Sequence, residues 1–160
     1  MKNALLGVAL LLAAAVPAQA AAPFVPASTK SELRSLLQQF DAQYLAYVPT
    51  RGPAHYLFIG FTANQASTNF RLADSRFPTS GPKQRSIFIA VDPYHGKLAG
   101  CIRGYKQTQR VDGSTIYLRD YTAWRCLRAP GKHLVRIFAE SSYVRGKELG
   151  LTVGSFKPLG

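Results

Sequence analysis

The amino-acid sequence predicts an α+β fold, in which an N-terminal amphipathic helix packs on a curved antiparallel β-sheet of about six or seven strands. Apolar residues recur at helical spacing in one long stretch, residues 29–48. The segments after it are short, rich in aromatic and β-branched residues, and separated by turn sequences at hairpin distances. No second long helical pattern follows, which excludes a parallel βαβ architecture because its strands need long crossovers.

Residues 1–20 have the organisation of a cleaved secretory signal peptide. Lys2 supplies a positive start, residues 4–16 are apolar throughout, and Ala18-Gln19-Ala20 matches a small-residue cleavage site. The apolar run is too short to span a bilayer comfortably. We therefore expect an exported protein of bacterial type, periplasmic or secreted, with no transmembrane segment after signal removal. Residues 21–27 are expected to form an extended leader, and residues 28–160 a single α+β domain.

The predicted helix over 29–48 begins with a capping box formed by Thr29 and Glu32 and ends before Pro49. We expect its apolar side to cover the core face of the sheet. The strands are expected at residues 56–62, 70–73, 85–91, 97–110, 114–128 and 133–140, followed by a broken final strand or two short ones over residues 144–156.

Export also predicts that Cys101 and Cys126 form one disulfide, because cysteines are oxidised in such compartments. Two buried free thiols are the alternative. A metal site is disfavoured, since the sequence contains no CxxC motif and no histidine at ligand spacing from either cysteine.

The charge balance predicts an anionic partner. The sequence has 20 Lys and Arg residues against 8 Asp and Glu, a formal net charge of +12, and loss of Lys2 would lower it by one. A basic surface favours nucleic acid, anionic lipid headgroups, lipopolysaccharide or an acidic protein. A basic exterior that only keeps the protein soluble is the alternative.

The cysteines constrain the hairpin expected between residues 97 and 128. With residues 112–113 at the centre of its turn, Cys101 faces Trp124 and lies diagonal to Cys126, about 7–8 Å away, at the limit for a disulfide. With residues 113–114 at the centre, Cys101 faces Cys126 directly. We prefer this second register, or the first with a bulge that shifts it.

One face of this hairpin is aromatic and basic along its length, and it is the predicted outward, binding face. Tyrosine rings can stack on bases or sugars, and arginine pairs with phosphate or carboxylate. Ordinary cross-strand pairing is the alternative explanation for the same residues. The predicted binding residues are Lys106, Arg110, Tyr117, Arg119, Tyr121 and Arg125.

These features favour an exported, disulfide-stabilised basic binding protein without a cofactor, of inhibitor, immunity or envelope-associated type, whose partner is an acidic protein or anionic polymer. One alternative is a small secreted hydrolase or toxin, nuclease-like, that uses His55, His95 or His133 with Glu140; nucleic acid is a partner only in that case. Another is an accessory subunit of an envelope or secretion assembly. The balance is against an enzyme, because no serine elbow, P-loop or dinucleotide motif is present.

Overall fold

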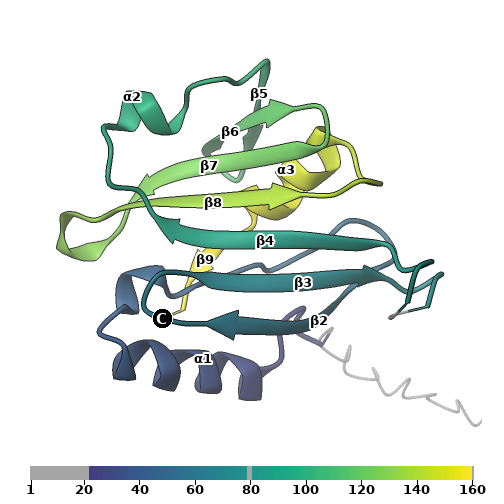
Figure 1. Cartoon of the computed structure of the whole chain (residues 1–160), viewed down its shortest axis with the longest axis horizontal. Helices are drawn as coiled ribbons and strands as arrows, with labels where there is room; N and C mark the ends of the chain where they lie inside the picture. Colours follow the sequence, from purple (N-terminus) through teal and green to yellow (C-terminus); the bar gives the residue numbers. More distant parts are fainter. Residues whose placement is uncertain (1–21, 79–80, 160) are drawn as a thin grey trace, which may run out of the picture.

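Seven antiparallel strands form the main sheet of a computed structural model that describes residues 22–78 and 81–159 (Figure 1). Their order across the sheet is β2-β3-β4-β8-β7-β6-β5. A separate antiparallel pair joins β1 (Tyr47–Val48) to β9 (Lys157–Pro158). The seven strands are β2 (Tyr56–Ala63), β3 (Thr68–Asp74), β4 (Ser86–Pro93), β5 (Gln107–Val111), β6 (Ser114–Arg119), β7 (Thr122–Arg128) and β8 (Leu134–Glu140).

In the part of the chain that the structure describes, three α-helices accompany the sheet: α1 (Ala27–Gln39), α2 (Leu98–Cys101) and α3 (Gly146–Gly154). The α+β class, the antiparallel sheet and the single disulfide are confirmed. Within residues 22–78 and 81–159, no helix is long and apolar enough to cross a membrane. The predicted signal peptide, residues 1–20, lies outside the described residues.

The first helix is shorter than the predicted range of residues 29–48. It begins at Ala27 with Pro26 at the N-cap, and no side chain caps it, so the expected capping box is wrong. It ends at Gln39, and Asp41 then adopts a φ of 51°, a left-handed conformation that cannot continue a helix. The apolar residues beyond this point form a short 3₁₀ turn and strand β1.

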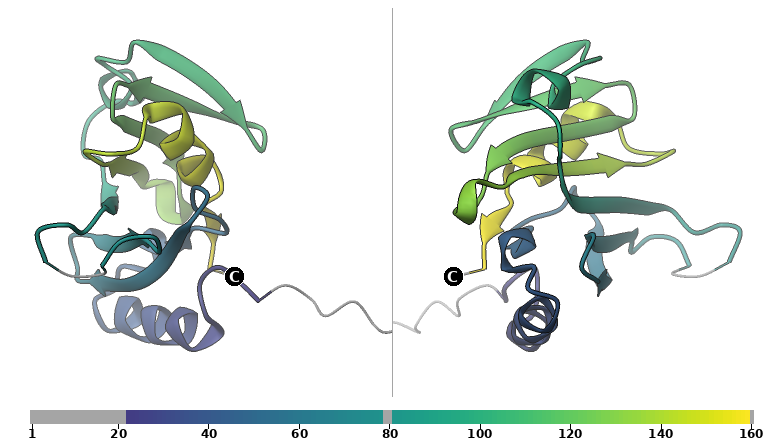
Figure 2. Two further views of the ribbon diagram at one scale, coloured as in Figure 1. Left: turned by 90° about the vertical axis from the view of Figure 1, so that its right-hand side faces the viewer. Right: turned by 60° about the vertical axis from the view of Figure 1, so that its left-hand side comes forward.

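Helices α1 and α3 pack on the same face of the sheet and enclose the core with it. Leu33 and Leu37 of α1, and Leu149 and Val153 of α3, are fully buried in one apolar cluster. A row of directly opposed, buried side chains crosses that face of the sheet: Phe70, Ile89, Ala139, Ala123 and Leu118. Helix α2 lies on the other side (Figure 2). We call this other side the open face.

The last predicted strand, over residues 144–156, is in fact helix α3. Its glycines at positions 146, 150 and 154 recur every four residues and so share one side of the helix. That side lies directly against the sheet, because a Cβ added at Gly154 would come within 2.4 Å of the Val111 Cβ. The glycine spacing therefore reflects close helix–sheet packing rather than breaks in a strand.

The preferred hairpin register, with residues 113–114 at the centre, is wrong. Val111 pairs with Ser114, so Asp112 and Gly113 form the central pair. Both have positive φ angles, 47° and 78°, as a type I′ turn requires. This turn matches the right-handed twist of the strands that it connects.

The hairpin arms are also shorter than predicted. The first strand begins only at Gln107, and the second arm is divided at Asp120, whose φ is 45°, into β6 and β7. Cys101 therefore lies on no strand: it ends α2, in the connection from β4 to β5, which passes over the three strands between them. It reaches Cys126 of β7 from above the open face, with the two Cα atoms 6.3 Å apart. The predicted disulfide is right, and the hairpin geometry used to explain it is wrong.

Candidate functional site: a groove on the open face

The open face carries aromatic side chains along one line across three strands. Tyr117 of β6 lies opposite Trp124 of β7, which lies opposite Phe138 of β8. The rings of Tyr117 and Trp124 are 6.1 Å apart between centroids, and Tyr105 extends the line at 5.3 Å from Tyr117. We call these four residues the aromatic row. Such pairs stabilise a sheet, and the exposed rings also offer flat surfaces to a ligand.

Helix α2 lies next to Trp124 of this row and forms one wall of a groove. Two contacts attach it to β7: the Cys101–Cys126 disulfide, and a hydrogen bond of 3.0 Å that the Trp124 indole N–H donates to the Cys101 carbonyl oxygen. The groove between α2 and the β6–β7 turn has a volume of about 520 Å³. Its principal side chains are those of Tyr94, Arg103, Arg119, Asp120, Tyr121, Thr122, Trp124, Arg136 and Phe138.

Three arginines make the groove positive. Arg136 is compensated by Asp92, with its Nη2 3.3 Å from Oδ2. Arg103 and Arg119 are exposed, and among the described residues neither guanidinium has an ion-pair or hydrogen-bond partner. The carboxylate of Asp120, which also lines the groove, is already paired with the Lys106 Nζ at 3.1 Å. The groove therefore presents two uncompensated guanidinium groups beside aromatic rings.

Most of the predicted binding residues lie on or beside the open face. Tyr117 belongs to the aromatic row, and Arg119 and Tyr121 line the groove. Lys106 pairs with Asp120 at the rim of the groove, and Arg110 on the edge strand β5 donates a hydrogen bond of 2.7 Å to the Thr115 hydroxyl. The structure thus brings together three of these residues at the groove or its rim and leaves Arg110 at the sheet edge.

Arg125 does not share that face, which corrects the prediction. It lies directly opposite Ile137, a fully buried residue of the core face. Its Nη1 donates to the Phe156 carbonyl oxygen at 3.4 Å, and burial lowers the pKa of its guanidinium. The prediction places Arg125 on the wrong face because the predicted hairpin has no turn at Asp120. That turn changes which residues of β7 face outward.

Sequence reasoning missed Arg103 and Arg136 as site residues. In residues 133–140, Arg136 and Phe138 alternate with the buried Val135 and Ile137. This alternation indicates that Arg136 and Phe138 face away from the core, so their shared face could have been predicted from the sequence. No comparable signal exists for Arg103, because its position depends on the path of the β4–β5 connection.

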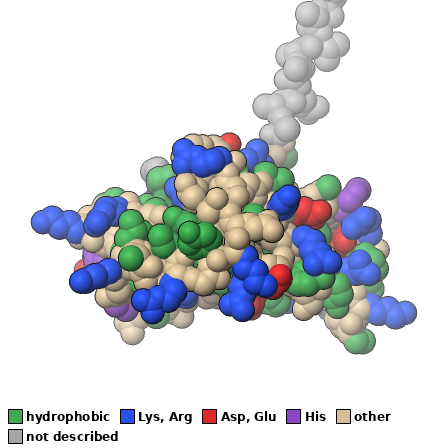
Figure 3. Space-filling view, turned by 90° about the horizontal axis from the view of Figure 1, so that it is seen from above, with side chains coloured by type: hydrophobic (Ala, Val, Ile, Leu, Met, Phe, Trp, Pro, Cys, Tyr) green, Lys and Arg blue, Asp and Glu red, His purple; other side chains and the backbone are tan. Residues whose placement is uncertain are grey.

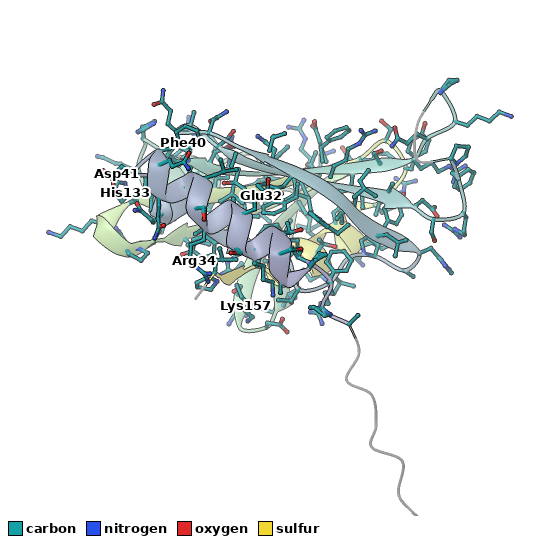
Figure 4. The ribbon with its side chains drawn as sticks, turned by 90° about the horizontal axis from the view of Figure 1, so that it is seen from below. Glu32, Arg34, Phe40, Asp41, His133 and Lys157 are labelled. Atoms are coloured by element: carbon teal, nitrogen blue, oxygen red, sulfur yellow. A yellow bond between two sulfur atoms is a disulfide. The ribbon has the colours of Figure 1, made fainter. Side chains whose placement is uncertain are left out.

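The three histidines are not gathered at a shared site. His55 precedes β2 and His95 follows β4; these strands run in the same direction, so the two residues lie at opposite ends of the sheet. His133 stacks on Tyr44 at 4.0 Å, near the C-terminal end of α1 (Figure 4). Glu140 lies at the far end of β8 from His133, about 23 Å away at about 3.3 Å per residue. Among the described residues, no group of three or more His, Cys, Asp or Glu side chains could hold a metal ion.

Comparisons with protein families, curated proteins and solved structures find no match. The chemistry of the surface is therefore the main guide to function. Seen from the end that carries α2 and β5, Lys and Arg side chains surround exposed hydrophobic groups and outnumber the acidic ones (Figure 3). A surface with an excess of positive charge attracts anionic ligands.

Proposed function

We propose that this protein is an exported, basic binding protein that uses the open face of its sheet to bind an acidic protein or an anionic polymer. The observation that carries this proposal is the pair of uncompensated guanidinium groups, Arg103 and Arg119, beside the aromatic row. Guanidinium groups form bidentate hydrogen bonds with carboxylates and phosphates, and aromatic rings add stacking area. Such a surface suits an inhibitor or immunity protein, or a protein attached to an envelope polymer.

Salt dependence of binding tests the proposal. The probes are heparin and poly-L-glutamate, titrated against the purified protein over a range of salt concentrations. We expect affinity to fall steeply as salt rises, because exposed charges more than about 8–10 Å apart are screened at physiological ionic strength. Binding that is absent, or equally tight at high and low salt, would overturn the proposal.

A charge-matched control separates the open face from net charge alone. The Arg103→Gln and Arg119→Gln variants should each weaken heparin binding, whereas Lys157→Gln should leave it nearly unchanged. Lys157 is exposed on β9 and lies on the side of the molecule that carries α1 (Figure 4). Equal losses in all three variants would mean that total charge, rather than the open face, determines binding.

The export part of the proposal rests on the pattern of residues 1–20 and is compatible with the disulfide. Expression of the full chain in a bacterial host, followed by fractionation and mass spectrometry, tests it. We expect a mature protein that begins at Ala21 in the periplasm or medium. An uncleaved protein that stays in the cytoplasm would contradict it.

A further inference from the structure

We propose that the groove is a binding site for a phosphate monoester carried on a ring, as in a phosphorylated sugar or a nucleotide. This inference rests on the proposed function, in which the open face binds anions, and it identifies the chemical group that the groove takes.

The charge of the groove favours a dianion. Arg136 is compensated by Asp92, at 3.3 Å, and Asp120 is compensated by Lys106, at 3.1 Å. Among the charged residues that line the groove, these pairs leave Arg103 and Arg119 uncompensated, with a total charge of +2. A phosphate monoester carries about −1.5 to −2 at pH 7, and its oxygens match the fork of an arginine. A single carboxylate would leave one of the two guanidinium groups uncompensated.

The size of the groove favours a ligand larger than phosphate alone. Its volume of about 520 Å³ lies in the range of small-molecule sites, about 300–1,000 Å³. Tyr94, Tyr121 and Phe138 contribute aromatic walls. Trp124 is only 6% exposed and its indole N–H is already bonded to Cys101, so it offers the ligand the face or edge of a ring rather than a donor. The Arg145 guanidinium lies 4.6 Å from the Tyr121 ring centre, and that of Arg136 lies 5.6 Å from the Phe138 ring centre. The flat face of a sugar or a base would stack on the parts of these walls that the two guanidinium groups leave open.

The groove is also held in shape before a ligand arrives. Cys101 is attached to β7 by the disulfide, and Arg103 follows it by two residues, with its backbone N–H donating to the Gly100 carbonyl oxygen at 3.3 Å. Tyr94 packs beneath α2 so closely that a Cβ at Gly100 would come within 2.7 Å of its hydroxyl oxygen. A site formed in advance loses less entropy on binding than a mobile one.

The test is calorimetric titration of the full mature protein with glucose 6-phosphate, AMP, inorganic phosphate and glucuronate. We expect glucose 6-phosphate or AMP to bind at least about tenfold more tightly than inorganic phosphate or glucuronate, a difference of about 1.4 kcal/mol. Comparison of the affinities of glucose 6-phosphate and AMP shows whether the preferred ring is a sugar or a base. Affinity should fall between pH 7.5 and pH 5, because the phosphate loses its second charge with a pKa of about 6. Binding of glucuronate as tight as that of both phosphate esters would overturn the inference.

Variants locate the binding. Arg103→Gln and Arg119→Gln should each weaken the phosphate ester by about tenfold or more, the effect of losing a charged hydrogen bond, and Lys157→Gln should not. The chain has one tryptophan, so a change in emission on titration shows that the ligand alters the surroundings of Trp124. Unchanged affinity in both arginine variants would overturn the inference.

The two proposals can fail separately. If heparin or poly-L-glutamate binds with the expected salt dependence while no phosphate ester binds, the groove is not a phosphate site and the open face still binds polyanions. If neither kind of ligand binds, the proposed function itself is wrong.

Discussion

The indole nitrogen of Trp124 donates a hydrogen bond of 3.0 Å to the carbonyl oxygen of Cys101, although 23 residues separate them. Cys126, two residues after Trp124 on the same face of β7, bonds to the Cys101 sulfur. Cys101 of α2 is thus attached to β7 twice, through its backbone carbonyl to Trp124 and through its side chain to Cys126. A helix of four residues has little stability of its own, so these contacts determine where α2 and the adjacent Arg103 lie.

Removal of the disulfide should affect both stability and the groove. The Cys101→Ala/Cys126→Ala protein should unfold with a free energy lower by about 3–4 kcal/mol, because the bond closes a loop of 25 residues. Phosphate-ester binding should also weaken, since Arg103 is no longer held. Urea unfolding followed by circular dichroism measures the first effect, and calorimetry under native conditions measures the second. Wild-type protein in reductant is the matched control and should lose stability in the same way. Unchanged stability in both the double variant and the reduced wild type would contradict the prediction.

Close packing of α3 predicts an unusual glycine effect. Gly154→Ala should destabilise the protein by about 1–3 kcal/mol, because the new Cβ would lie 2.4 Å from both the Cβ and the Cγ1 of Val111. Adding Val111→Ala should recover part of that loss, which a double-mutant cycle of unfolding free energies measures. Gly60→Ala is the control, since nothing lies within 4 Å of its added Cβ. Additive effects of the two substitutions would contradict the proposed contact.

The sequence predicts local strands better than their arrangement. Strict alternation marks residues 133–140 as a strand with one buried side. The composition of residues 111–114 also indicates a turn, but its central pair is Asp112 and Gly113 rather than the preferred residues 113–114. Helix α3 escaped prediction because glycine has low helix propensity; here its missing side chain permits contact with β5, and tertiary packing overrides propensity.

The groove required information that local patterns do not carry. Arg103 and Arg136 are far apart in the chain, and they meet only because the connection from β4 to the distant edge strand β5 crosses the open face. A disulfide between Cys101 and Cys126 is consistent with several paths of that connection. The prediction of a single long hairpin corresponds to a path that the structure does not have. The same assumption assigned Arg125 to the outer face.

Arg119 and Arg125 should therefore respond in opposite ways to the same substitution. Arg125→Gln should lower the free energy of unfolding by about 1 kcal/mol, because it loses a hydrogen bond to the Phe156 carbonyl oxygen and packing in the covered face, and should leave binding of heparin unchanged. Arg119→Gln should weaken heparin binding and leave stability within about 0.5 kcal/mol. Urea unfolding and heparin titration of both variants check this pair of outcomes. Loss of binding in the Arg125 variant, at unchanged stability, would restore the original face assignment.

Asp74 should make the stability of the protein depend on pH in acid. The residue is 1% exposed, and its carboxylate accepts hydrogen bonds of 2.9 and 2.7 Å from the Arg76 guanidinium, which lower its pKa from 3.8 to about 2. Because the pKa is lower in the folded state, the ionised form favours folding: the contribution is complete above about pH 4 and is lost as pH falls through 2. We expect Asp74→Asn to cost about 1–2 kcal/mol at pH 6, a modest value because Arg76 is 55% exposed.

Urea unfolding between pH 2 and pH 6 measures this contribution. The stability difference between wild type and the Asp74→Asn protein should shrink toward the acid end, as the wild-type carboxyl takes up its proton. Asp41→Asn is the control: Asp41 is exposed at the end of α1 (Figure 4), has no ion pair among the described residues, and has a positive φ that asparagine also tolerates. Curves for wild type and the Asp74 variant that stay parallel over this range would show that Asp74 contributes no ionised-state stability.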